Sequence, residues 1–128
     1  MDNDFFDSII KGELNRLRGL IANSADVNAI ILPPEWTPLL IAVECNNPEV
    51  VRLLLSYGAN ANIANFNKQT LLHIAVNKNA ISIARLLIED GNAEVNVLDG
   101  RGYTPLKYAK EFGYTEIIEL LIAHAGIE

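Results

Sequence analysis

Few residues in this chain of 128 have side chains suited to catalysis or metal binding: two histidines, His73 and His124, and one cysteine, Cys45. A metal site needs several His, Cys or carboxylate ligands at close spacing, and the sequence places no such set beside His124. Cys45 has no basic neighbour in the sequence that would favour a reactive thiolate. As the only cysteine it also excludes an internal disulfide, which is typical of a reducing compartment.

Carboxylates offer general acid–base chemistry, and Glu116 and Glu119 lie one helical turn apart. On an exposed helix such a pair is more simply explained as solvated charge. The Gly100-Arg101-Gly102 segment is interpreted as a loop tip rather than a nucleotide cradle, and the sequence contains no Gly-rich phosphate loop, His-Glu-x-x-His or Gly-x-Ser-x-Gly pattern. The sequence therefore predicts a protein that is not an enzyme and that uses no cofactor and no metal.

A seven-residue pattern occurs three times in the sequence, and His73 lies in one of its copies. The segment Thr37-Pro38-Leu39-Leu40-Ile41-Ala42-Val43 returns as Thr70-Leu71-Leu72-His73-Ile74-Ala75-Val76 and as Thr104-Pro105-Leu106-Lys107-Tyr108-Ala109-Lys110, with the threonines 33 and then 34 residues apart. An apolar segment begins 13 residues after each Thr, at Val50, Ile83 and Ile117. A fixed period of this size predicts stacked structural repeats.

With these motifs the chain resembles ankyrin repeat proteins over essentially its whole length; Thr37-Pro38-Leu39, Thr70-Leu71-Leu72-His73 and Thr104-Pro105-Leu106 carry the resemblance. It implies an all-α ankyrin-repeat solenoid of stacked antiparallel helix pairs joined by projecting hairpin-like loops. We expect one domain over residues 1–128, with repeats at about 2–31 (N-terminal cap), 32–64, 65–98 and 99–128 (C-terminal cap), and a complete chain. The resemblance also implies a structural His73, bonded to neighbouring backbone and Thr side chains.

The residues between the two helices of each repeat support this alignment. They are Gly12, Asn46, Asn79 and Gly113. A helix commonly ends with a residue in the left-handed conformation, where Gly is best and Asn next. Lys110 stands where the earlier repeats have Val43 and Val76, which indicates a site that no following repeat buries.

Composition narrows the classes of partner. The net charge is −6, half the residues are hydrophobic, and Lys and Arg form no block, so we expect no nucleic-acid partner. The longest apolar runs have about six residues, well short of the roughly 18 that span a bilayer, and the acidic N-terminus lacks the features of a secretory signal. We expect no membrane partner, a cytoplasmic location and a monomer in isolation.

The resemblance implies binding of another protein through the loop tips and the concave face of the first helices. Carried over position by position, the expected contacts are Trp36, Gln69 and Tyr103 before each Thr; Glu44, Cys45, Asn77, Lys78, Glu111 and Phe112 at the ends of the first helices; and Phe66, Asn67 and Arg101 at the loop tips. Alternatively, Trp36 and Tyr103 pack on neighbouring loops as structure. The apolar loop at 30–34 either adds to the interface or folds back onto the first repeat.

We favour an adaptor or inhibitor that occludes a partner's surface. A second hypothesis is a microbial effector or immunity-type protein that acts on a foreign partner, in which case it is delivered into a host cell. Asn28 and Asn96 resemble sites that asparaginyl hydroxylation modifies in animal ankyrin proteins, but we prefer a structural role in the turn for both.

Overall fold

The computed structural model describes residues 4–23, 25–30 and 36–126. The described residues form eight α-helices, in agreement with the predicted all-α class. None of these helices is both long enough and apolar enough to cross a membrane. The chain divides into two compact units, unit 1 (Met1–Asn60) and unit 2 (Ala61–Glu128), and each is described by itself.

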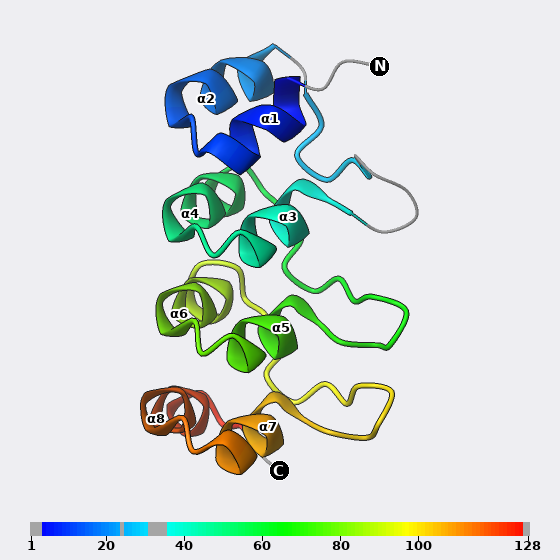
Figure 1. Ribbon diagram of the computed structural model, residues 1–128, viewed down its shortest axis with the longest axis vertical. Helices are drawn as coiled ribbons and strands as arrows, with labels where there is room; N and C mark the ends of the chain where they lie inside the picture. The colour runs from blue at the N-terminus through cyan, green and yellow to red at the C-terminus, as the bar shows by residue number, and fades with distance from the viewer. Residues whose placement is uncertain (1–3, 24, 31–35, 127–128) are drawn as a thin grey trace. The chain divides into compact units, whose positions relative to one another are not determined.

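Each unit consists of two helix pairs. Unit 1 contains α1 (Asp4–Lys11), α2 (Leu14–Ala22), α3 (Pro38–Glu44) and α4 (Pro48–Ser56), and unit 2 contains α5 (Leu71–Asn77), α6 (Ile81–Glu89), α7 (Pro105–Phe112) and α8 (Thr115–Ala123). Within unit 1, α1 packs beside α3 and α2 beside α4; within unit 2, α5 packs beside α7 and α6 beside α8 (Figure 1). The first helices of a unit therefore form one layer and the second helices another.

The repeated threonine is the N-cap of the first helix in three of the four pairs. The Thr37 Oγ1 accepts a hydrogen bond from the Leu40 amide at 3.3 Å. In the same way the Thr70 Oγ1 accepts from the His73 amide and the Thr104 Oγ1 from the Lys107 amide. This bond satisfies one of the amides that a helix start leaves without an intrahelical partner. Pro38 and Pro105 then occupy the first helical turn, where a missing N–H costs little.

The turn between the two helices of each pair depends on one left-handed residue. Gly12, Asn46, Asn79 and Gly113 have φ angles of 69°, 54°, 54° and 71°, as the sequence predicts. After this turn the Asn47 side chain caps α4 by accepting from the Val50 amide at 3.2 Å. A single residue thus reverses the chain and lets the second helix pack against the first.

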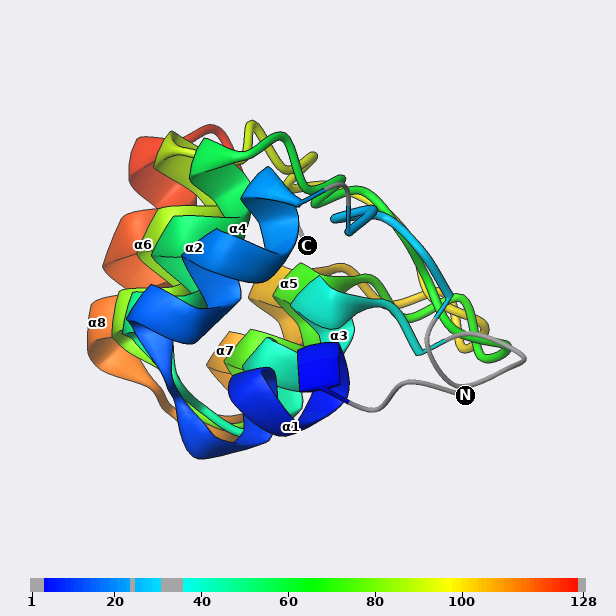
Figure 2. The ribbon, with the colours of Figure 1, turned by 90° about the horizontal axis from the view of Figure 1, so that it is seen from above.

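The loops that precede α5 and α7 in unit 2 are hairpin-like, and both project to the same side of the helices (Figures 1 and 2). In one, the Asn65 amide donates to the Gln69 carbonyl at 3.0 Å; in the other, the Asp99 amide donates to the Tyr103 carbonyl at 3.0 Å. The side chains of Asn65 and Asp99 also accept from backbone amides across their own turns. Each tip is therefore fixed by backbone hydrogen bonds and by one side chain of its own loop.

Asparagines brace the connections that follow the second helices. The Asn28 side chain accepts from the Asn60 amide at 2.8 Å, and the Asn62 side chain accepts from the Glu94 amide at 2.8 Å. The Asn96 side chain donates to the Ala125 carbonyl at 3.1 Å. Asn28 and Asn96 thus have the structural role in the turns that we preferred for them.

The apolar stripe of each helix is buried within its unit. Val43 and Val76 are fully buried, whereas Lys110 at the equivalent position is exposed. Burying a side chain the size of Leu54 or Leu87 stabilises the fold by roughly 1.5–3 kcal/mol. The loops, in contrast, are held mainly by hydrogen bonds.

The left-handed turn gives a first prediction. Because Asn79 has a φ of 54°, Asn79→Gly should leave the free energy of unfolding unchanged or raise it, whereas Asn79→Ala should lower it by about 1 kcal/mol. Urea denaturation followed by circular dichroism measures both. Lys78→Ala, one residue earlier with a φ of −87°, is the matched control and should be neutral within about 0.5 kcal/mol. Equal losses at Asn79 for Gly and Ala would show that φ is not the cause.

Candidate functional site

The predicted contact residues lie mostly at the surface of their units. Exposed are Glu44, Cys45, Phe66, Asn67, Lys78, Arg101, Glu111 and Phe112; Trp36, Gln69, Asn77 and Tyr103 are half-buried. Trp36, Glu44 and Cys45 belong to unit 1 and the other nine to unit 2. Of the apolar loop at 30–34, Ile30 is 55% exposed, and the remaining positions lie outside the described residues.

Unit 2 brings four of these residues together in one pocket. The pocket lies between the two hairpin loops, has a volume of about 470 Å³, and is lined by Phe66, Asn67, Lys68, Gln69, Asp99, Gly100 and Arg101. The Gly100 amide donates to the Asn67 carbonyl at 2.7 Å, which joins the two tips. A Cβ at position 100 would lie 2.9 Å from that carbonyl oxygen, so the approach requires glycine.

Aromatic rings connect two further predicted residues. Tyr108 packs against Tyr103 with 5.1 Å between ring centroids and stacks on Phe112 at 6.3 Å. The Arg101 guanidinium lies 5.2 Å and the Lys107 ammonium 4.8 Å from the centroid of the Tyr103 ring. Tyr103 therefore packs on α7 of its own repeat rather than on a neighbouring loop, and two cations lie near its ring. Phe112, in contrast, is 51% exposed.

His73 links the start of α5 to the following loop. Its Nδ1 lies 3.1 Å from the Thr70 amide and 2.9 Å from the Thr70 Oγ1, and its Nε2 lies 2.9 Å from the Tyr103 carbonyl oxygen. A carbonyl can only accept, so Nε2 carries the proton and Nδ1 accepts from Thr70. The expected bonds to backbone and Thr are confirmed. Burial lowers the pKa of His73, although the Tyr103 carbonyl opposes this shift.

Asp99 holds the second loop, and the sequence analysis missed it. Its Oδ1 accepts from the amides of Arg101 at 2.9 Å and Tyr103 at 3.0 Å, and its Oδ2 accepts from the Tyr108 hydroxyl. Burial alone would raise the pKa of Asp99, but the bonds from Tyr108 and the two amides outweigh it and hold the pKa below the ordinary value. Burial, followed by the bond to Asp99, raises the pKa of Tyr108.

The alignment of the repeats could have identified the role of Asp99. Asp99 stands five residues before Thr104, and Asn65 stands five residues before Thr70. Both accept amides across the loop, so a short side chain with an acceptor oxygen was the shared feature. The ring of Tyr108 could not be found this way, because Ile41 and Ile74 occupy its position in the other repeats.

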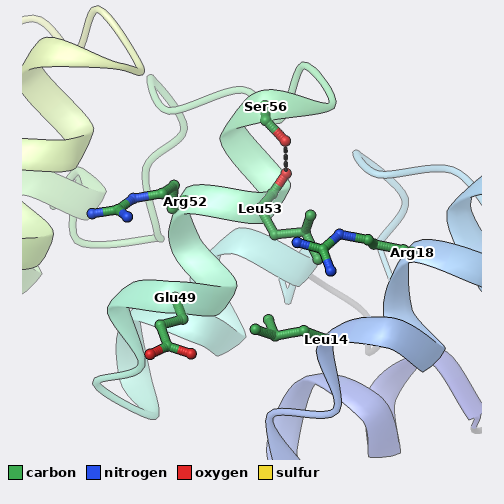
Figure 3. A pocket seen from close by; sticks show the side chains of 6 residues that line it. All are labelled: Leu14, Arg18, Glu49, Arg52, Leu53 and Ser56. Atoms are coloured by element: carbon green, nitrogen blue, oxygen red, sulfur yellow. Dashed lines mark hydrogen bonds between the residues drawn. The ribbon is translucent and has the colours of Figure 1, made fainter.

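A second pocket, of about 380 Å³, lies in unit 1 between α2 and α4. It is lined by Leu14, Arg18, Glu49, Arg52, Leu53 and Ser56 (Figure 3). The Ser56 hydroxyl is committed to the Leu53 carbonyl at 2.6 Å, and Arg52 extends away from Arg18 and Leu14 in this view. Its polar groups do not converge on a point, so it offers no arrangement for catalysis.

Two-layered helix pairs with capped starts and hairpin tips define a helical repeat protein. Comparison with known proteins specifies the family: the sequence profile described as ankyrin repeats (three copies) matches residues 6–99 and 60–128. The chain belongs to the ankyrin repeat family. That family is a typically non-catalytic fold whose general role is protein–protein interaction.

Relatives share about two fifths of their aligned residues with this chain. An ankyrin repeat protein of fowlpox virus (strain NVSL) is 40% identical over 110 residues, which cover 82% of this chain and 32% of the relative. The human transient receptor potential cation channel subfamily A member 1 is 38% identical over 86 residues, covering 67% of this chain and 8% of the channel. The ankyrin repeat, SAM and basic leucine zipper domain-containing protein 1 of Dasypus novemcinctus is 36% identical over 96 residues, covering 71% of this chain and 20% of the relative. The chain thus spans a third or less of each.

His73 gives a prediction about stability. His73→Ala should lower the free energy of unfolding by about 2–4 kcal/mol, because it leaves a cavity and removes the acceptor of Thr70 and the donor to Tyr103. His124→Ala is the control. The His124 Nε2 lies 3.5 Å from the Glu89 carboxylate, and a partly exposed pair of this kind contributes little, so the loss of this side chain should cost less than about 1 kcal/mol. Similar losses for both variants would contradict the prediction.

The same histidine predicts a pH dependence. The pKa of His73 is lower in the folded than in the unfolded state, so below pH about 6.5 the unfolded chain binds the proton first. The contribution of His73 is therefore complete above pH about 6.5 and is lost as the pH falls through its folded pKa. Urea midpoints from pH 8 to 5 should decline for the wild type and for His124→Ala, and decline less for His73→Ala. Parallel curves for all three would exclude this effect.

Proposed function

We propose that this chain is a non-catalytic interaction module that binds a partner protein through its loop tips and the exposed side of its first helices. The observation that carries the proposal is the exposure of large aromatic side chains on this side of unit 2, with Phe66 79% and Phe112 51% accessible. Aromatic residues and arginine contribute most of the energy of protein interfaces, and Arg101 lies in the same loop as Tyr103. The proposed contacts remain the twelve residues named from the sequence.

The mechanism is rigid presentation. The tips are fixed by Asn65 and Asp99, and the Gly100–Asn67 hydrogen bond joins them. A partner therefore meets side chains whose backbone is already ordered, and the entropy lost on binding is small. As part of this proposal, the four repeats act as one domain that is monomeric in isolation and cytoplasmic, without enzymatic activity.

Two roles fit such a module. The first is an adaptor or inhibitor that occludes a surface of its partner, and we favour it because it requires only the fold and the exposed contacts. The second is a microbial effector that acts on a foreign partner inside a host cell. The 40% identity to a protein of fowlpox virus favours this second role, since a virus acts within a host.

The experiment compares truncation of two exposed apolar side chains on the loop side with truncation of two exposed apolar side chains at the second helices. Immobilised wild-type chain should capture a partner from lysate, and Phe66→Ala with Phe112→Ala should reduce this capture at least tenfold, because each removes a large exposed contact. The control is Tyr57→Ala with Ile122→Ala, whose side chains are 44% and 54% exposed in or just after the second helices. Circular dichroism verifies the folds. Loss of capture by the control pair alone would place the interface on the second helices and overturn the proposal.

A further inference from the structure

In unit 2 most positive charges lie on the loop side and most negative charges lie on the second helices. Its loop-side layer, residues 63–79 and 97–113, comprises α5, α7 and the two hairpin loops, and its charged residues are Lys68, Lys78, Arg101, Lys107, Lys110, Asp99 and Glu111. Its second-helix layer, residues 80–96 and 114–126, carries Arg85, Glu89, Asp90, Glu94, Glu116 and Glu119. The loop side therefore has an excess of positive charge in a chain whose net charge is −6.

Two of these cations converge on the pocket between the loop tips. Lys68 and Arg101 both line it, together with the exposed ring of Phe66. Among the described residues neither cation forms an ion pair, whereas Lys107 lies 3.9 Å from Glu111. The one carboxylate in the pocket, Asp99, is buried and already accepts from Tyr108 and two backbone amides. The pocket thus presents two cations and one buried carboxylate, a net positive charge, beside an aromatic ring.

The backbone of Lys68 is a separate observation. Lys68 has a φ of 60°, and the equivalent residue of the next loop, also two positions before the threonine, is Gly102 with a φ of 79°. Glycine adopts this conformation without strain, and a lysine does not. The Lys68 side chain is exposed, so burial does not offset the cost. A strained residue held at a surface pocket is a reason to look for a function of its side chain.

We propose that the loop-tip pocket binds an acidic segment of the partner protein, in which carboxylates flank an aromatic or large aliphatic residue. The carboxylates pair with Lys68 and Arg101, and the apolar residue packs on Phe66. Arg101 offers a planar fork suited to a carboxylate, and charge complementarity speeds the encounter. A nucleic acid fits less well, because its phosphates repeat along a line and the cations here do not form a block. The inference rests on the proposed function and names the chemistry of the partner.

The test uses the ¹⁵N-labelled full chain and defined probes. The first probe is a 12-residue peptide of alternating Glu and Asp with one central Trp; the second replaces each acid by its amide; the third is single-stranded oligothymidine of similar length. We expect amide shifts at residues 64–70 and 98–103 with the acidic peptide, at least tenfold weaker binding of the amide peptide, and several-fold weakening when salt rises from 50 to 300 mM. Equal binding of the amide peptide, shifts confined to α6 and α8, no shift at millimolar peptide, or tighter binding of the oligonucleotide would overturn the inference.

Variants separate charge from fold. Lys68→Glu with Arg101→Glu should abolish binding of the acidic peptide, whereas Arg85→Glu, a charge reversal in α6, should leave its affinity within twofold. Lys68→Gly removes the cation and relieves the left-handed strain, so it should weaken binding three- to tenfold while the melting temperature stays equal or rises. A folded Lys68→Gly chain that binds as well as the wild type would contradict the role of Lys68.

The two proposals fail in different ways. If the aromatic pair Phe66 and Phe112 is required for capture but the acidic peptide does not bind, the chain is an interaction module and the inferred partner chemistry is wrong. If the acidic peptide binds at the loop tips but capture is indifferent to Phe66 and Phe112, the pocket takes acidic segments and the wider interface is wrong.

Discussion

Short helices are the constraint on which this structure depends. Every helix has between seven and nine residues, and isolated helices shorter than about 12–15 residues are marginal in water. Each is therefore stabilised by a partner helix within its repeat, and α3, α4, α5 and α7 also begin at a side-chain cap. Thr70 supplies the cap of α5, and Asn79 turns the chain so that α6 returns against it. The recurring residues of the sequence are those that satisfy this requirement.

The same register fixes the surface. A loop that ends at a capping threonine has its tip at a set distance before that residue: Asn67 and Arg101 both lie three residues before Thr70 and Thr104. His73 then connects the start of α5 to the Tyr103 carbonyl, 30 residues later, and Asp99 connects the tip of that loop to Tyr108. His73 and Asp99 therefore hold the loops of unit 2, and both side chains are engaged in the fold.

The fold could be predicted from the sequence because its determinants are local. Thr104 and the apolar residues after it specify a capped helix, and Asn46 and Asn79 specify turns, whatever the rest of the chain does. The pocket between the loop tips could not be predicted, because it depends on the approach of Gly100 to the Asn67 carbonyl across two repeats. The left-handed φ of Lys68 could not be predicted either, because lysine does not favour that conformation. Only the equivalent residue of the next loop, Gly102, indicates it.

The loop side of unit 2 can differ in charge from the second helices because different positions build the fold and form the surface. The positions that build a repeat are confined to its caps, turns and apolar stripes, so the remaining surface positions are free to differ between repeats. Lys107 and Leu40 occupy the same position, as do Lys110 and Val76, yet all three repeats keep the capped first helix. Unit 2 uses this freedom to collect cations and aromatic rings on the loop side while the second helices stay acidic. A negative net charge and a basic surface can therefore coexist in one chain, because the two occupy different layers of unit 2.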